Sequence, residues 1–259
     1  MHHTSSTIRR LLLLLAFLPL CFSTGCIRLF EKPIYDHLTP NGRTQKILFI
    51  GNSLTYYNDL PGLTEQLSAG QDRQLWEDRV TVANVSLGFH WSYSAARKHL
   101  NQGDWSYVVL QEFSTRPLDD PDAAIKDFSM WGAEVNRIGA KPIIFENWPH
   151  IMENGSADLA MAKMHRTYQK IQSDIGGEIA PIGFAWLRCR KEHPEIALFV
   201  DEKHPTEAGT YLTACVIFKT IYHKPAAGLP TVINGLKLDP HTTEVLQKIA
   251  DEDGQAGPR

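Results

Sequence analysis

The chain has 259 residues, 43% of them hydrophobic, which is enough to bury the core of one sizeable domain. A net charge of −3 argues against a nucleic-acid-binding protein, because such proteins usually present a basic surface. Aromatic residues make up 10% of the chain and no long block of like charge occurs, so the composition is not that of a disordered protein.

The first 25 residues have the layout of a secretory signal peptide. Two arginines precede an apolar run at 11–22, which is too short to span a bilayer, and small residues follow it. The boundary "STGC" resembles that of a bacterial lipoprotein, although Ser23 stands where leucine is usual. We therefore predict export, to the periplasm or to a membrane through lipidated Cys26. The alternative is a buried amino-terminal helix.

The cysteines leave one question open. If Cys26 carries a lipid, Cys189 and Cys215 remain, and in an oxidising compartment they could form a disulfide. Two buried free thiols are the alternative, and the sequence does not choose between them. The chain has no Cys-x-x-Cys and no His-Glu-x-x-His, so we predict no metal site.

Residues 26–43 contain two prolines and show no periodicity, which indicates a tether before a single domain at 44–259. Within this domain, short apolar runs predict strands. Most of these runs are continuous rather than alternating, as expected for strands covered on both faces. The predicted strands are 46–50, 79–85, 107–111, 141–146 and 178–184.

Helical patterns fill the intervals between these strands. One helix should end at Gly70, because glycine readily adopts the left-handed conformation that closes a helix. Two longer helices are expected at 120–139 and 156–176, and a third after Pro205. Asp239 and Pro240 open a last short helix. This alternation predicts a three-layer α/β/α sandwich with about five strands in a mainly parallel sheet, whose carboxyl edge would hold the site.

The stretch "ILFIGNSLTYYND" ends a buried strand by presenting Ser53. A serine in this position often caps the next helix, but it can also be a nucleophile held at the edge of the sheet. The chain contains neither a Gly-x-Ser-x-Gly elbow nor a phosphate-binding P-loop. Ser53 alone therefore does not decide between the two interpretations.

A second motif, "DEKHPTEAG", contains Asp201 three residues before His204. Serine needs a positioned base to act as a nucleophile, and a carboxylate can orient the histidine that takes its proton. One loop before the last long helix could supply both groups. The alternative is a solvated loop whose Asp201 and His204 are unrelated.

Together, "IGNSLT" and "DEKHPTEAG" resemble the first and last sequence blocks of the SGNH hydrolases, also called the GDSL esterase and lipase superfamily. The resemblance covers about the whole mature domain, and Asn52 stands where the family motif has Asp. It implies a flavodoxin-like fold and a catalytic triad of Ser53, Asp201 and His204.

Acyl transfer also requires donors that stabilise an oxyanion. The Ser53 N–H should be free at a helix start. The resemblance implies a second donor at Gly88, which could instead be only a turn glycine. The family's third block normally has Gly-x-Asn-Asp, whereas this chain has "VVLQEFS". This resembles a subgroup with Gln in that block, so Gln111 would be the third donor. Alternatively, Gln111 and Glu112 merely end the strand in solvent.

The sequence thus predicts an exported serine esterase acting on short acyl esters, such as acetyl esters of carbohydrates, without a cofactor. A lipid or lysophospholipid esterase is one alternative, and a non-catalytic glycan-binding lipoprotein on the same fold is another. The sequence does not indicate the oligomeric state. Other polar and aromatic residues predicted at the same edge could shape a pocket or simply pack there: Tyr56, His90, Trp91, Glu112, Arg116, Trp148 and His150.

Overall fold

The computed structural model describes residues 44–150, 156–233 and 235–252. The predicted signal peptide (1–25) and tether (26–43) lie outside the described residues, and so does Cys26. Among the described helices, none combines the length and the apolar composition that a bilayer-spanning segment requires.

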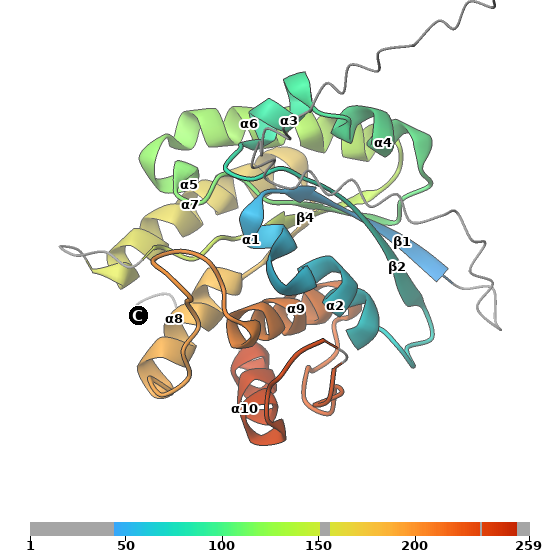
Figure 1. Ribbon diagram of the computed structural model, residues 1–259. Helices are drawn as coiled ribbons and strands as arrows, with labels where there is room; N and C mark the ends of the chain where they lie inside the picture. The colour runs from blue at the N-terminus through green and yellow to red at the C-terminus, as the bar shows by residue number, and fades with distance from the viewer. Residues whose placement is uncertain (1–43, 151–155, 234, 253–259) are drawn as a thin grey trace, which may run out of the picture.

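Five parallel strands form one sheet at the centre of the molecule (Figure 1). They are β1 (Thr44–Gly51), β2 (Gln74–Thr81), β3 (Tyr107–Leu110), β4 (Lys141–Phe145) and β5 (Glu178–Ala180). Their order across the sheet is β2-β1-β3-β4-β5, which is the order of flavodoxin-like folds. The chain reverses its direction of winding between β1 and β3, and in such sheets ligands bind at the carboxyl ends of these strands.

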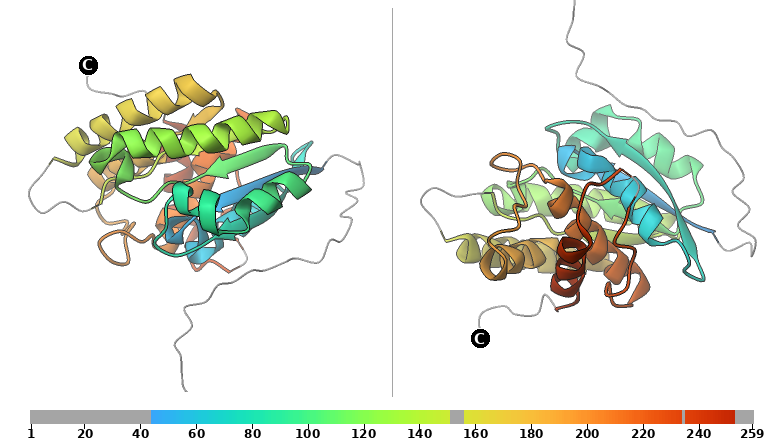
Figure 2. Two further views of the ribbon diagram at one scale, coloured as in Figure 1. Left: turned by 90° about the horizontal axis from the view of Figure 1, so that it is seen from above. Right: turned by 60° about the horizontal axis from the view of Figure 1, so that its bottom comes forward.

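Helices cover both faces of the sheet, above and below it in Figure 1 and seen from two further sides in Figure 2. One layer contains α3 (Leu87–Tyr93), α4 (Ala96–Gln102), α5 (Arg116–Asp119), α6 (Pro121–Arg137) and α7 (Ala157–Ile175). The other contains α2 (Leu60–Leu67), α8 (Ile182–Glu192), α9 (Glu207–Tyr222) and α10 (Pro240–Asp251). Short α1 (Ser53–Tyr56) and the 3₁₀ turn η1 (Tyr57–Asp59) connect β1 to α2.

Alternation along the strands divides the core into two parts. In β1, Ile47 and Phe49 pack with the α2, α8, α9 and α10 layer, whereas Leu48 and Ile50 pack with the opposite layer. All four side chains are fully buried. This arrangement explains why the strand has a continuous apolar sequence, and it fixes the position at which the chain emerges as Gly51.

Side-chain caps explain where several helices begin. The side chains of Asp120, Ser156, Thr206 and Asp239 each accept a hydrogen bond from a backbone N–H in the first turn of the following helix. Proline in the first turn supports the starts of α6 and α10. These starts agree with the predicted ones.

The three-layer fold and its parallel sheet are confirmed, but two predicted strands are misplaced. The strand expected at 79–85 is β2, which begins at Gln74 and ends at Thr81. As an edge strand it alternates between buried and partly exposed residues, so it lacks an apolar run. The strand expected at 178–184 ends at Ala180, because Pro181 is the N-cap residue of α8. Helices α3, α4, α5 and α8 were not predicted.

The structure also answers the question about the cysteines. Cys189 in α8 and Cys215 in α9 are both buried and both free. Burial raises the pKa of the Cys189 thiol to about 12, which keeps it protonated and unreactive. The predicted alternative of two buried thiols therefore describes this structure.

Candidate active site

Ser53 is the first residue of α1, directly beyond the carboxyl end of β1. The cap of this helix is not Ser53 but Asn52, whose Oδ1 accepts a hydrogen bond of 3.1 Å from Leu54 N–H. The Asn52 Nδ2 donates to the Val85 carbonyl at 3.1 Å, which ties the turn to the loop after β2. The Ser53 hydroxyl is therefore not used as a helix cap.

The structure brings Ser53, His204 and Asp201 into one row. His204 Nε2 lies 3.0 Å from Ser53 Oγ, and His204 Nδ1 lies 2.7 Å from Asp201 Oδ2. The serine and the histidine are 151 positions apart in the chain. Both distances allow a hydrogen bond, and the order of the three groups is that of a serine nucleophile with its base and the carboxylate that orients the base.

Asp201 is held by its own loop. Its Oδ1 accepts hydrogen bonds from the backbone N–H groups of Lys203 (2.8 Å) and His204 (2.7 Å). The backbone N–H of His204, the imidazole of His204 and the N–H of Lys203 hold the pKa of the Asp201 carboxyl well below its usual range. Asp201 is therefore an anion at neutral pH, as the orienting member of a triad must be.

The loop that carries these residues is braced at several points. Phe199 and Pro205 form an antiparallel bridge, and Val200 N–H donates to the His204 carbonyl at 3.0 Å. Trp148, which was predicted at this edge, donates from Nε1 to the Lys203 carbonyl at 3.1 Å. Its ring stacks on Trp186 at 3.7 Å between centroids, so the brace is anchored in the core.

Among the described residues, Ser53 is the one expected oxyanion donor whose N–H has no protein acceptor, because it opens α1. The Gly88 N–H donates to Asp127 Oδ2 at 3.1 Å. Asp127 is itself 3.2 Å from Arg116 Nη1. A Cβ added to Gly88 would meet the Asp127 carboxylate at 2.7 Å, which shows how closely this carboxylate covers the glycine.

Gln111 is also engaged with protein groups. Its Oε1 accepts hydrogen bonds from Asn52 N–H (2.8 Å) and Thr55 Oγ1 (3.0 Å), and its Nε2 donates to the Glu112 carbonyl. Gln111 is 1% exposed, so it does not end the strand in solvent. Its amide holds the turn on which Ser53 stands, and the hole expected from Ser53, Gly88 and Gln111 is not formed by three free donors in this structure.

Three further residues predicted at this edge, His90, Trp91 and His150, differ in their surroundings. His90 is buried, with Nε2 2.8 Å from the Gly51 carbonyl, and Trp91 packs edge-on against Trp131 at 5.3 Å. Both support the fold. His150 lies near the triad, since Asp201 and His204 act on its charge, but burial is the largest cause that lowers its pKa.

Three residues at the site were not predicted from the sequence: Tyr57, Asn58 and Asp127. Tyr57 stacks on the His204 ring, with centroids 4.4 Å apart and planes at 9°. Asn58 binds the segment that follows His204. Asp127 shares a face of α6 with core residues Ala124, Phe128 and Trp131, and this position on an apolar stripe was the available indication.

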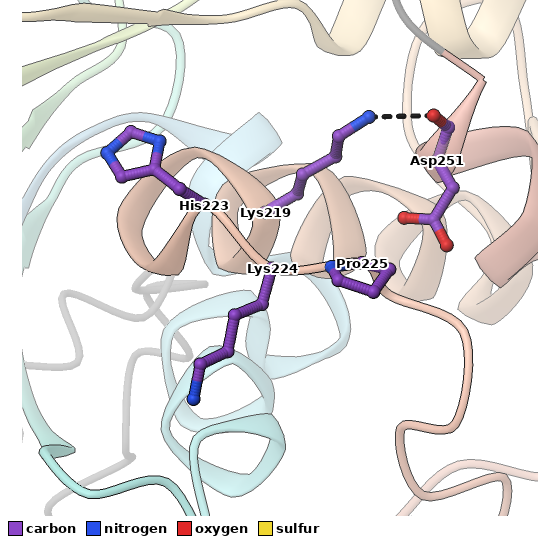
Figure 3. Close-up of a pocket in the computed structure, with 5 residues that line it drawn as sticks. All are labelled: Lys219, His223, Lys224, Pro225 and Asp251. Atoms are coloured by element: carbon purple, nitrogen blue, oxygen red, sulfur yellow. Dashed lines mark hydrogen bonds between the residues drawn. The ribbon is translucent and has the colours of Figure 1, made fainter.

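A pocket of about 430 Å³ lies elsewhere, at the end of α9 (Figure 3). Both of its lysines are hydrogen-bonded to neighbouring residues. Lys219 donates to the Asp251 carbonyl at 2.7 Å, and Lys224 donates to the Gln71 side chain at 2.8 Å. The 16 residues of α9 separate it from the triad by about 24 Å. It is therefore not part of the candidate active site.

The structure also bears on metal binding. Within 44–150, 156–233 and 235–252, no cluster of three or more potential ligands could hold a metal ion.

Comparison with known proteins supports the fold assignment. No protein-family model matches the sequence, and no curated protein sequence matches it. A protein from Slackia heliotrinireducens, provisionally assigned to the SGNH hydrolases, superposes with a TM-score of 0.61 at 24% identity, over 69% of this chain and 100% of that one. A DUF4886 family protein from Bacteroides uniformis has a TM-score of 0.66 at 17% identity, over 80% and 93%.

A mutant of Axe2, an acetylxylan esterase from Geobacillus stearothermophilus, gives a TM-score of 0.54 at 14% identity, over 70% of this chain and 95% of that one. The matched structures are covered almost completely, whereas the sequences have diverged widely. The likeness is therefore one of fold. This chain has the three-layer α/β/α fold of the SGNH hydrolases.

Proposed function

We propose that this chain is an exported serine esterase that hydrolyses short acyl esters, with acetyl esters of carbohydrates as its substrate class. The observation that carries the proposal is the row Ser53–His204–Asp201, with contacts of 3.0 and 2.7 Å. Export is supported by the layout of residues 1–25, and the substrate class by the name of the acetylxylan esterase with the same fold. This chemistry needs no cofactor.

In the acylation step, Ser53 Oγ attacks the ester carbonyl carbon while His204 Nε2 takes the hydroxyl proton. Asp201 accepts a hydrogen bond from the Nδ1–H of the resulting imidazolium and stabilises its charge. The tetrahedral intermediate then collapses, the carbon–oxygen bond to the alcohol breaks, and the alcohol leaves with the proton from His204. The acyl group remains on Ser53.

In the second step, a water molecule gives a proton to His204 and attacks the acyl carbon of the acyl-enzyme. The bond from the acyl carbon to Ser53 Oγ then breaks, His204 returns the proton to Ser53 Oγ, and the acid leaves. The Ser53 N–H stabilises the oxyanion in both steps. The Gly88 N–H can join it only when the oxyanion replaces the Asp127 carboxylate as its acceptor. Gln111 contributes by holding the backbone of Asn52 rather than by donating to the oxyanion.

The direct test is hydrolysis of p-nitrophenyl acetate by the purified full-length chain and by Ser53→Ala. The variant should lose at least about a thousandfold in kcat, as enzymes do when the nucleophile of a triad is removed. Reaction with a fluorophosphonate should add one adduct, and mass spectrometry should locate it on Ser53. Equal trace rates in both proteins, with no adduct, would refute the esterase proposal.

One observation favours a second candidate, a non-catalytic glycan-binding lipoprotein. Two of the three expected oxyanion donors are engaged by Asp127 and by the Glu112 carbonyl. Calorimetry with acetylated and deacetylated xylo-oligosaccharides separates the candidates: binding without turnover supports the second. A series of p-nitrophenyl esters from acetate to laurate tests the substrate class, since an increase in kcat/KM with chain length would indicate a lipid esterase instead.

Export can be tested on the same chain. Expression of the full-length gene should yield a mature protein whose mass lacks residues 1–25, with a lipid on Cys26 if the lipoprotein interpretation holds. Intact residues 1–25 in the mature protein would contradict both the cleavage site and the proposed localisation.

A further inference from the structure

We propose that Tyr57 and Asn58 form a clamp that positions the His204 imidazole against Ser53. The inference rests on the proposed function, because it assigns the two residues that hold its general base. They are positioning residues, which act on the reaction through His204. They lie in η1, four and five positions after Ser53, so the segment that carries the nucleophile also contacts its base.

The first half of the clamp is the Tyr57 ring. It lies over the His204 ring with centroids 4.4 Å apart and an angle of 9° between the planes, which is a stacked pair. Asp201 and Ser53 contact the imidazole at opposite nitrogens, Nδ1 and Nε2. These two contacts still permit the ring to tilt about the line joining them. A parallel ring against its face opposes this tilt.

The second half is the Asn58 side chain. Its Nδ2 donates to the Pro205 carbonyl at 3.1 Å and to Thr210 Oγ1 at 2.9 Å. Pro205 directly follows His204, and Thr210 lies in the first turn of α9. Asn58 therefore fixes the backbone on the carboxyl side of His204, across a separation of 147 positions in the chain.

An unusual backbone conformation makes both contacts possible. Asn58 (φ 48°) and Asp59 (φ 57°) are consecutive left-handed residues that are not glycine. Asn and Asp tolerate this conformation better than other side chains, yet it is still less stable than the right-handed one. Ion pairs with β2 hold the turn in place. Asp59 pairs with Arg79, and Arg79 Nη2 lies 2.6 Å from Oε1 of the buried Glu77.

Core packing does not account for these residues. Tyr57 is only half-buried and Asn58 is exposed, so neither fills the interior. Strained conformations persist where the surrounding structure enforces them, and they concentrate at functional sites. Here the strained turn places a ring on the base and an amide on the residue that follows it.

The test compares Tyr57→Leu, Tyr57→Phe and Asn58→Gly with the wild type, as full-length chains. Leucine removes the stacked ring, whereas phenylalanine keeps it. Glycine adopts a positive φ without strain, so Asn58→Gly removes only the amide donors. Tyr57→Leu and Asn58→Gly should lower kcat at least about tenfold with little change in KM, because a misplaced general base slows the chemical step. Tyr57→Phe should stay within about threefold of the wild type.

Two controls remove similar interactions away from the site. Tyr222→Leu removes a ring packed on Phe218 at 4.7 Å, and Asn136→Ala removes an amide bonded to the Ile175 carbonyl at 2.8 Å. Each kcat is divided by the fraction of sites that a fluorophosphonate titrates, so that a merely less stable protein is not counted as a slower enzyme. Both controls should keep the wild-type kcat.

Hydrogen exchange measured by mass spectrometry tests the clamp without any turnover. Amides between 198 and 206 should exchange faster in Asn58→Gly and Tyr57→Leu than in the wild type or in either control. Unchanged exchange in both variants would overturn the clamp, and so would an unchanged kcat in an active enzyme. If the wild type proves inactive, the proposed function fails while the exchange result still decides whether the clamp exists.

Discussion

Glu112, which follows Gln111 at the end of β3, provides a quantitative test of the structure around the site. It is fully buried, and its Oε1 accepts hydrogen bonds from Phe113 N–H (2.6 Å) and Leu87 N–H (3.3 Å). Within the described part of the chain, its Oε2 has no hydrogen-bond partner. Burial raises the pKa of Glu112 to about 7, and the nearby Asp127 carboxylate adds to the increase.

This increase makes stability depend on pH. Between its ordinary pKa of 4.5 and the folded value of about 7, the Glu112 carboxyl is protonated in the folded state and ionised in the unfolded state. The folded state then binds more protons, so the free energy of unfolding falls as the pH rises through this range and stays lower above it. The whole difference corresponds to about 3 kcal/mol.

Glu112→Gln removes the titration and keeps the shape of the side chain. Its amide oxygen can accept the two backbone N–H groups, and its NH₂ group occupies the position of the protonated oxygen. Urea unfolding of both proteins at pH 5 and pH 8 measures the effect. The wild type should lose about 2–3 kcal/mol more than Glu112→Gln between these pH values, and exposed Glu244→Gln should behave as the wild type does. Parallel pH dependences in the wild type and Glu112→Gln would refute a protonated Glu112.

Two further substitutions test the triad and its oxyanion donors. In Asp201→Asn, the two backbone N–H groups bound by Oδ1 require the amide oxygen there, so the NH₂ group faces His204 Nδ1. The proton then resides on Nε2, His204 cannot accept the Ser53 proton, and kcat for p-nitrophenyl acetate should fall about 10⁴-fold; a loss below tenfold contradicts the triad. Asp127→Ala removes the acceptor of the Gly88 N–H and should raise kcat about tenfold, because tenfold corresponds to about 1.4 kcal/mol, close to the lower end of what a hydrogen bond to a charged group contributes. A kcat that does not rise would contradict a role for Gly88 as a second oxyanion donor.

The sequence predicted the fold because most of its strands and helix starts depend on local patterns. Strands β1, β3 and β4 are continuous apolar runs, and the caps at Asp120 and Ser156 mark the helix starts. Asp201 and His204 are three positions apart, so their contact is nearly determined by the loop that contains them. The row that joins them to Ser53 was expected only from the resemblance between two short motifs.

The features that the sequence did not reveal depend on contacts between distant segments. No residue near Gly88 in the sequence indicates that a carboxylate from α6 accepts its N–H, because Asp127 is 39 positions away in the chain. Gln111 was expected to donate to an oxyanion, yet the backbone N–H of Asn52 fixes its Oε1 as an acceptor. Tyr57 and Asn58 belong to no periodic pattern, and the groups they contact lie near position 205.

The two contacts of the Ser53–His204–Asp201 row therefore have different structural origins. The Asp201–His204 contact is formed within one loop, which is closed by the Phe199–Pro205 bridge and capped by Thr206 at the start of α9. The Ser53–His204 contact depends instead on how β1 and η1 lie against α9. Substitutions that shift α9 against its neighbours should thus separate the serine from the histidine and leave the aspartate in place. Tyr57 and Asn58 of η1 contact His204 and the start of α9. η1 therefore links the loop that carries Asp201 and His204 to the strand that carries Ser53.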